Sequence, residues 1–161
     1  TKVLSEMFPK APIFTLLYDE KSVGESFEKE RVVTSNLQKL PKFVRNKHTY
    51  LLRMFPRAVE NFNLADFDIV ISSSNSFVHG VITNSDTKHI CYYHSPTRYL
   101  WDWYNEYFQD IGFKGLKQLA ARVYLSKVRT WDQLAQRRVD LSIANSVNVQ
   151  NRIKKYYRKI F

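Results

Sequence analysis

The sequence predicts an α/β fold in which helices cover both faces of a parallel sheet, within a single domain of residues 1–161. Three observations predict it. Short apolar segments typical of strands alternate along the chain with segments of helical spacing. The 161 residues are enough for one core, and 44% of them are hydrophobic, which argues against disorder. No apolar run approaches the roughly 20 residues that would span a bilayer.

The first third of the chain predicts two strands and two helices. Residues 3–8 have helical spacing and end at Pro9, and because this helix opens the chain without a cap we expect a fragment of a longer protein. Residues 13–18 and 31–35 are apolar enough for strands, and the polar residues 19–29 predict a loop between them. Residues 41–60 predict a helix that is kinked or restarted at Pro56.

The middle of the chain predicts a strand over residues 69–72, followed by a run of small polar residues, 72–76, of which four are serines and one is asparagine. Such side chains at the carboxyl end of a strand can cap the next helical turn or bind a ligand oxygen. Asp66 and Asp68 precede this strand. Ligands bind at the opposite end of parallel strands, so we interpret the two aspartates as part of a turn and not as a metal site.

The stretch Lys88–Phe108 predicts a strand that ends at His94 and is followed directly by a helix. Ser95 is a good N-cap residue and Pro96 a good first helical residue, so the helix is expected to begin there. Its spacing gives two faces, one of Leu100, Trp103, Tyr104 and Tyr107, the other of Arg98, Trp101, Asp102 and Asn105. His94 would then lie beside a helix N-terminus, where open α/β sheets place their ligands.

The last third predicts a long helix, a strand and a final helix. Gly112 and Gly115 bracket a break before the helix of residues 116–139. Residues 140–144 are a short buried strand, and Asn145 and Ser146 cap a helix that ends at about Tyr157. The apolar stripe predicted for the long helix consists of Leu116, Leu119, Ala120, Val123, Tyr124, Val128, Trp131, Leu134 and Ala135.

Among the four histidines, His94 is the candidate for chemistry, because the other three fit core or surface positions. His89 and His94 are an odd number of residues apart on one strand, so they face opposite sides and cannot share a metal. An imidazole at the strand end could donate a hydrogen bond to a sugar hydroxyl or a phosphate. Arg98 and Asp102 have the spacing of an ion pair, and an exposed Trp101 would be a platform for a sugar ring.

The net charge of +10 is concentrated in the C-terminal third. Residues 1–113 contain 13 basic and 13 acidic side chains, whereas residues 114–161 contain 12 basic and 2 acidic ones. Such a patch attracts phosphates of nucleic acid, lipid or nucleotide, although a solvated face or one covered by a missing domain has the same composition. The basic and aromatic helix of residues 41–60 fits either an anionic membrane or ordinary packing. The single cysteine, Cys91, fits a core thiol.

Several spaced motifs resemble a bacterial and archaeal subgroup of family 4 glycosyltransferases. Residues 94–104, HSPTRYLWDWY, are similar to its H-[ST]-P-x-R-Y-x-W-D segment. RTWD at residues 129–132, RVD at 138–140 and IANSVNVQNRIKKYY at 143–157 are similar to its later motifs. FPKAPIFTLLYD and DIVISSSNSF also resemble the subgroup, and many of its members are assigned to mannosyl transfer in surface-polysaccharide assembly.

The resemblance implies a GT-B architecture, in which two Rossmann-like domains face each other across a cleft and transfer retains the anomeric configuration, usually without a metal. This chain resembles the acceptor-side N-terminal domain without its first strand. His94 matches the histidine that reaches the donor sugar, with a catalytic role of orienting it and steadying charge on the leaving diphosphate. The positions matched to substrate binding are Ser73, Ser74, Arg98, Tyr99, Trp101, Asp102, Asn145 and Ser146.

The implied partners are a nucleotide-diphosphate sugar as donor substrate, a lipid-linked or saccharide acceptor, and the chain's own C-terminal domain. No other cofactor is implied. The fragment alone is expected to be inactive, and the intact protein cytoplasmic, peripheral at the inner face of an anionic membrane. Two alternatives stay open. One is a basic nucleic-acid-binding module, which would bind arbitrary DNA or RNA with strong salt dependence, although the resemblance implies no nucleic acid. The other is a non-catalytic scaffold.

Overall fold

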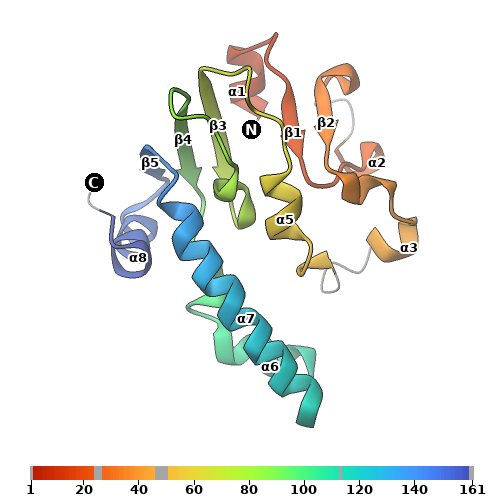
Figure 1. Ribbon diagram of the computed structural model, residues 1–161, viewed down its shortest axis with the longest axis vertical. Helices are drawn as coiled ribbons and strands as arrows, with labels where there is room; N and C mark the ends of the chain where they lie inside the picture. The colour runs from red at the N-terminus through yellow and green to blue at the C-terminus, as the bar shows by residue number, and fades with distance from the viewer. Residues whose placement is uncertain (1, 24–26, 46–50, 113, 160–161) are drawn as a thin grey trace. The chain divides into compact units, whose positions relative to one another are not determined.

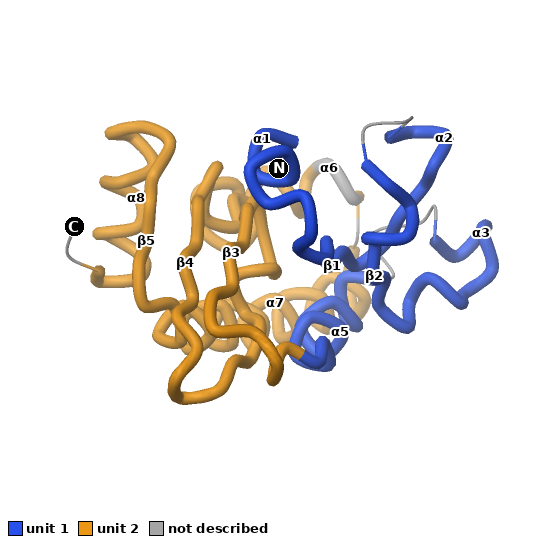
Figure 2. The backbone as a smooth tube through the Cα atoms, turned by 90° about the horizontal axis from the view of Figure 1, so that it is seen from above, with its two compact units in different colours: residues 1–63 blue, residues 64–161 orange. Residues whose placement is uncertain are grey.

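The computed structural model describes residues 2–23, 27–45, 51–112 and 114–159 (Figure 1). The chain divides into two compact units, residues 1–63 and residues 64–161 (Figure 2). Each unit combines helices with parallel strands, so the predicted α/β class is confirmed. A single domain over residues 1–161 stays a prediction.

The first unit contains a two-stranded parallel sheet. Strand β1 (Ile13–Thr15) pairs with β2 (Val32–Thr34), and Ser35 extends the pairing by donating from its backbone N–H to Thr15 O at 3.0 Å. The other elements of this unit are α1 (Lys2–Met7), α2 (Glu20–Val23), η2 (Lys29–Arg31), η3 (Asn36–Lys39), α3 (Lys42–Arg45) and α5 (Phe55–Glu60).

Two predictions for this unit need comment. The loop expected over residues 19–29 is wrong at α2, because Asp19 accepts hydrogen bonds from Lys21 N at 3.2 Å and Ser22 Oγ at 3.1 Å and so starts a helical turn. The helix expected over residues 41–60 is described as two pieces, α3 and α5, and Pro56 lies in the first turn of the second piece. His48 lies outside the described residues.

The second unit is built on three parallel strands in the order β3 (Ile69–Ser74), β4 (Lys88–Tyr93) and β5 (Leu141–Ala144). β4 lies in the middle, and its alternate side chains His89, Cys91 and Tyr93 are buried on one face. Val149 and Ile153 of helix α8 (Val147–Tyr157) pack on that face together with Val139. One part of the core of this unit therefore lies between the sheet and α8.

The opposite face of this sheet is less buried than the face that packs against α8. Ile69 and Ile71 of β3 and Leu141 and Ile143 of β5 are exposed on it. Among the described residues of this unit, the expected covering of both faces by helices is not seen. Alternation along β3 and β5 places these apolar side chains away from α8, because successive residues of a strand point to opposite faces.

A helical hairpin follows β4. Helix α6 (Tyr104–Ile111) ends at Gly112, which adopts the left-handed conformation at φ 67°, and α7 (Gly115–Gln136) begins at Gly115, at φ 59°. The break predicted at these glycines is confirmed, since both φ values favour a residue without a side chain. The Arg122 guanidinium of α7 lies 4.8 Å from the ring centroid of Phe108, so the two helices run side by side (Figure 1).

The stripe predicted for α7 is only partly a packing face. Val128 and Ala135 are buried, as is Leu125, whereas Leu116, Leu119, Val123 and Leu134 are exposed. The helix therefore has apolar residues on two sides, and only one side meets the rest of the unit. Within the described part of the chain, no helix has both the length and the apolar character required to cross a bilayer.

The helix predicted to begin at Pro96 is wrong. Residues 94–97 are irregular, a 3-10 turn η5 (Arg98–Leu100) follows, and the α-helix begins only at Tyr104. Ser95 donates its hydroxyl to Pro96 O at 2.9 Å and caps no helix. His94 is therefore not followed directly by the helix that was expected there, and the two faces predicted for residues 98–107 do not exist on one helix.

Candidate functional site

The carboxyl ends of β3, β4 and β5 meet at one edge of the sheet, where Ser74, Tyr93 and Ala144 are in register. The residues that follow these strands, His94 and Asn145 among them, continue the ladder: His94 N donates to Ser74 O at 2.9 Å, and Asn145 N donates to Tyr93 O at 3.2 Å. Ligands of parallel α/β sheets bind at this edge. The edge is therefore the candidate site.

His94 is exposed at this edge and is oriented by its neighbours. Its Nε2 lies 2.9 Å from Ser73 Oγ, and its ring meets that of Tyr92 edge-on with centroids 5.1 Å apart. His89 lies on the other face, buried, with Nε2 2.9 Å from Ser72 Oγ. The prediction that the two histidines face opposite sides of the sheet is thus confirmed.

Ser73 and Ser74 have different surroundings. The Ser73 hydroxyl stands beside His94, on the side of the sheet that is not packed against α8. Ser74 is buried, and its hydroxyl donates to Ser76 O and lies 3.3 Å from His79 Nδ1. Its hydroxyl is used inside the fold, where it fixes the turn that leads into η4 (Phe77–Gly80).

A buried carboxylate, Asp132 of α7, holds the segment after His94 in place. It accepts hydrogen bonds from Thr97 Oγ1 at 3.0 Å and from Trp101 Nε1 at 3.0 Å. The Tyr157 hydroxyl of α8 donates to it at 2.8 Å, and His79 Nε2 lies 3.3 Å away at an ion-pair distance. Burial alone would raise the pKa of Asp132, but the His79 contact and the hydrogen bonds lower it below its ordinary value.

Arg98 and Asp102 do not form the expected ion pair. The Arg98 guanidinium lies 4.7 Å from the ring centroid of Trp103, whereas Asp102 pairs with Arg152 Nε of α8 at 3.2 Å. The Tyr156 hydroxyl also donates to Asp102. The i, i+4 spacing brings two side chains together only on a helix, and residues 98–102 are not one.

Trp101 is half-buried, so the exposed platform expected there is wrong. Its ring stacks on that of Tyr156 with centroids 4.8 Å apart and an interplanar angle of 16°, and its indole N–H points to Asp132. The tryptophan exposed in this segment is Trp103. Tyr99 is also held inward: its hydroxyl lies 3.3 Å from Ser76 Oγ, and burial raises its pKa well above the ordinary value.

Asn145 and Ser146 are exposed after β5. Ser146 Oγ accepts a hydrogen bond from Val149 N at 3.3 Å, which confirms it as the N-cap of α8. Farther along this helix, Arg152 Nη1 lies 3.4 Å from Ser95 Oγ. The middle of α8 is thereby linked to the residue that follows His94.

The arrangement offers hydrogen bonds to a ligand but no metal cluster. Across residues 2–23, 27–45, 51–112 and 114–159, no group of three or more His, Cys, Asp or Glu side chains is placed to hold a metal ion. The exposed polar side chains that follow the three strands are those of Asn75, His94, Asn145 and Ser146, and Arg98 is exposed four residues after His94. They can bind hydroxyl or phosphate oxygens.

The sequence reasoning missed Asp132 as the centre of this arrangement, with its partners in α8. A signal was present. Asp132 lies four residues after Val128 and three before Ala135, on the apolar side of a helix otherwise rich in lysine and arginine. A carboxylate at such a position is either destabilising or surrounded by hydrogen-bond donors.

Compared with known proteins, the chain matches no family, no curated protein and no solved structure. The resemblance to glycosyltransferases therefore depends on the short motifs alone.

Proposed function

We propose that this chain is the acceptor-side, Rossmann-like domain of a retaining GT-B glycosyltransferase. In this proposal the intact enzyme moves a sugar, mannose in our first choice, from a nucleotide-sugar to a lipid-linked or polysaccharide acceptor. A C-terminal domain would hold most of the donor, so the chain by itself would be inactive. The enzyme would work in the cytoplasm, at the inner face of the membrane.

One observation carries the proposal: the motif histidine His94 is exposed at the carboxyl edge of parallel strands, beside Ser73. If the Ser73 hydroxyl donates to Nε2, the other ring nitrogen carries the proton and can donate outward. A hydrogen bond from that nitrogen would orient the donor sugar and steady negative charge as the diphosphate leaves.

The other motif residues would take two kinds of role. Arg98, Asn145 and Ser146 are exposed and would contact the substrates directly. Trp101 is held by Asp132, Asp102 by α8, and Tyr99 by Ser76. These three residues would shape the acceptor side by fixing the segment that follows His94.

The test uses the longer protein of which the proposal makes this chain a part. It would be incubated with labelled nucleotide-sugars and a membrane lipid extract, and label in the lipid fraction would be counted. His94→Ala is expected to lower transfer at least 100-fold. Lys88→Ala, at the exposed amino end of the same strand, is the matched control and should leave transfer unchanged. Transfer that survives His94→Ala would remove His94 from the site.

A nucleic-acid-binding module is the second candidate, favoured by the 12 basic residues between positions 114 and 161. It predicts that the chain binds arbitrary DNA or RNA and that the affinity falls steeply with salt. The glycosyltransferase proposal predicts little such binding. Titration of labelled oligonucleotides at two salt concentrations separates the two.

A further inference from the structure

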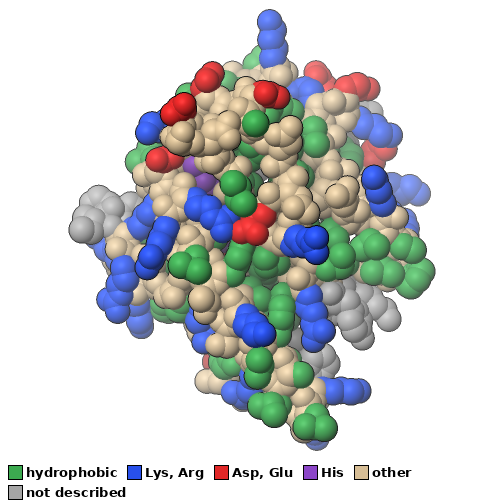
Figure 3. Space-filling model, in the orientation of Figure 1, with side chains coloured by type: hydrophobic (Ala, Val, Ile, Leu, Met, Phe, Trp, Pro, Cys, Tyr) green, Lys and Arg blue, Asp and Glu red, His purple; other side chains and the backbone are tan. Residues whose placement is uncertain are grey.

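Two ionisable side chains of the second unit are buried together. On the face shown in Figure 3, lysine, arginine, aspartate and glutamate side chains lie at the surface, where water solvates them. His79 of η4 and Asp132 of α7 are instead 1% and 0% exposed, and His79 Nε2 lies 3.3 Å from Asp132 Oδ1. Removing such groups from water costs free energy, so stability alone does not account for the pair.

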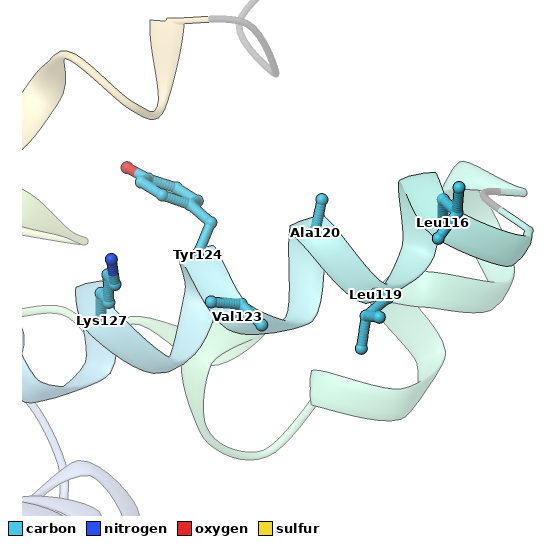
Figure 4. Close-up of a pocket in the computed structure, with 6 residues that line it drawn as sticks. All are labelled: Leu116, Leu119, Ala120, Val123, Tyr124 and Lys127. Atoms are coloured by element: carbon cyan, nitrogen blue, oxygen red, sulfur yellow. The ribbon is translucent and has the colours of Figure 1, made fainter.

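The pair lies at the buried second half of α7. In the first half, Leu116, Leu119 and Val123 line an open pocket (Figure 4). Asp132 comes four residues after the buried Val128, which places both on the same side of the helix. The carboxylate therefore belongs to the side of α7 that packs within the unit.

The His79 ring joins Asp132 to the turn that follows β3. Its Nδ1 lies 3.1 Å from Ser76 O and 3.3 Å from Ser74 Oγ. A backbone carbonyl has no proton to give, and the Ser74 hydroxyl already donates its own proton to Ser76 O. The proton of this contact therefore belongs to Nδ1, which donates it to the turn.

The other ring nitrogen of His79 faces a carboxylate. Nε2 is buried and makes no well-aligned hydrogen bond among the described residues, but Asp132 Oδ1 is at an ion-pair distance. Asp132 also accepts hydrogen bonds from Thr97, Trp101 and Tyr157, and such donors favour its charged form. A bare lone pair on Nε2 would be repelled by this charge, whereas a proton there makes the contact attractive. With protons on both nitrogens, the ring is an imidazolium.

The surroundings of the ring leave Asp132 as its counter-ion. The other titratable or charged groups that the structure places around it are Tyr93 and His89 of β4, Tyr157 of α8 and Arg138. Burial raises the pKa of both phenols well above the ordinary value, so they are neutral. Burial lowers the pKa of His89 to about 4, so this ring is neutral at pH 7. Arg138 is a cation, and its Nη1 donates to Gly80 O at 2.8 Å.

The pair connects the two strand ends that carry the candidate site. Ser73, whose hydroxyl lies 2.9 Å from His94 Nε2, is the chain neighbour of Ser74 on the His79 side. Thr97, which donates to Asp132, follows His94 by three residues. Each partner of the pair thus holds one side of the Ser73–His94 contact, and separating the partners would move one side relative to the other.

We propose that His79 is a buried imidazolium and that, paired with Asp132, it positions the Ser73–His94 contact. His79 is then a positioning residue, because it acts through the turn after β3 and touches no substrate. The protonation state and the positioning of His94 require only the fold of this unit. The consequence for catalysis rests on the proposed function.

NMR of the full chain with isotope-labelled histidine tests the protonation state. At pH 7.5 an exposed imidazole is largely neutral, so a charged ring is distinctive there. The His79 ring is expected to show protons on both nitrogens, and its resonances are assigned by their loss in His79→Gln. A neutral His79 ring, in either tautomer, would overturn the proposal.

The same spectra test the positioning role through His94. His79→Gln can still donate one hydrogen bond but carries no charge, so the His94 ring resonances should shift. Val128→Ala is the matched control for lost stability, because it removes buried methyl groups from α7 and leaves the pair intact. Its His94 resonances should stay in place, and circular dichroism should show that both variants are folded. Unchanged His94 resonances in folded His79→Gln would overturn the positioning role.

Kinetics of the longer parent protein test the consequence for catalysis. His79→Gln should lower kcat about tenfold and leave KM nearly unchanged, since the substrates do not touch His79. A kcat equal to wild type would overturn this consequence. Absence of transfer by the wild-type parent would instead overturn the proposed function, and the NMR results on the chain would still decide whether His79 is charged and positions His94.

Discussion

At the scale of single residues, His89 has the most unusual environment. It is buried on the face of the sheet that packs against α8, and its Nδ1 has no hydrogen-bond partner among the described residues. Burial lowers its pKa to about 4. The nearby His79 ring adds to the shift, and the carboxylate of Asp140 opposes it. A neutral imidazole is thus part of the folded state.

The first prediction is a loss of stability in mild acid. In the unfolded chain His89 titrates near 6.5, so below that pH the unfolded state takes up the proton first. The free energy of unfolding should therefore have its full value above about pH 7. It should fall by about 2–3 kcal/mol as the pH is lowered from 6.5 to 4. Urea unfolding at pH 7.5 and 4.5 measures it.

His89→Gln is the control for this prediction. A glutamine amide can keep the bond to Ser72 but does not titrate. Other groups titrate equally in both proteins, so the difference between their pH dependences belongs to His89. Identical pH dependences of wild type and variant would contradict the prediction.

The second prediction concerns Ser73, whose hydroxyl orients His94. Ser73→Ala should slow transfer by the parent enzyme about tenfold, as the loss of an orienting hydrogen bond commonly does. The unfolding midpoint should hardly move, because Ser73 contributes little to the core. Ser85→Ala, in an exposed turn, is the control. A rate for Ser73→Ala equal to wild type would show that the His94 ring is fixed by other contacts.

At the scale of elements, Asp132 links α7 to α8 and to the segment around η5. The third prediction is that Asp132→Asn lowers the free energy of unfolding by about 3 kcal/mol, since the amide turns an N–H₂ toward groups that are donors themselves. Urea unfolding measures the loss. The Trp101 indole N–H resonance should shift in the NMR spectrum, and an unshifted resonance would mean that this bond is absent in solution.

Close packing between η4 and α7 gives the fourth prediction. A Cβ added at Gly80 would lie 2.4 Å from the ring of Trp131. Gly80→Ala should therefore lower the free energy of unfolding by about 1–3 kcal/mol, because the indole must move. Thermal unfolding measures this. Ser126→Ala, on the exposed side of α7, is the control, and equal midpoints for the two variants would contradict the packing described.

The elements also show what sequence could and could not predict. Predictions that depend on residues within one element were confirmed: the helix is broken at Gly112 and Gly115, and Ser146 caps α8. The prediction of a helix beginning at Pro96 was wrong, because hydrogen bonds to residues far away in the sequence hold this segment in another conformation. Thr97 reaches Asp132 over 35 residues, and Arg129 Nε donates to Leu100 O at 2.7 Å. No local pattern contains such partners.

At the scale of the whole molecule, the α/β class and the uneven charge followed from composition and periodicity. The candidate site followed only in part. His94 was placed by its position after a strand, whereas Asp132 needed the fold to bring α7 under the segment that follows His94. Periodicity likewise found the apolar residues of α7 but not which of them are buried, since Leu116 and Leu125 look alike in the sequence.

The single cysteine of the chain lies in the middle strand of the second unit. Cys91 is fully buried, and burial raises the pKa of its thiol to about 11. A thiol reagent therefore meets neither an accessible sulfur nor a thiolate while the sheet is closed. The rate at which Cys91 reacts with a thiol reagent should therefore report how often this sheet opens.

The fifth prediction is that labelling of Cys91 by a maleimide follows opening of the unit. Labelling should be at least 100-fold slower than that of a free cysteine peptide, because only the open fraction reacts. The same experiment on Gly80→Ala should run faster by the factor that its loss of stability predicts. Wild-type labelling as fast as the peptide would mean that β4 is exposed in solution. If labelling is slow, as expected, its rate measures how often the sheet opens, and no reporter group has to be introduced into the protein.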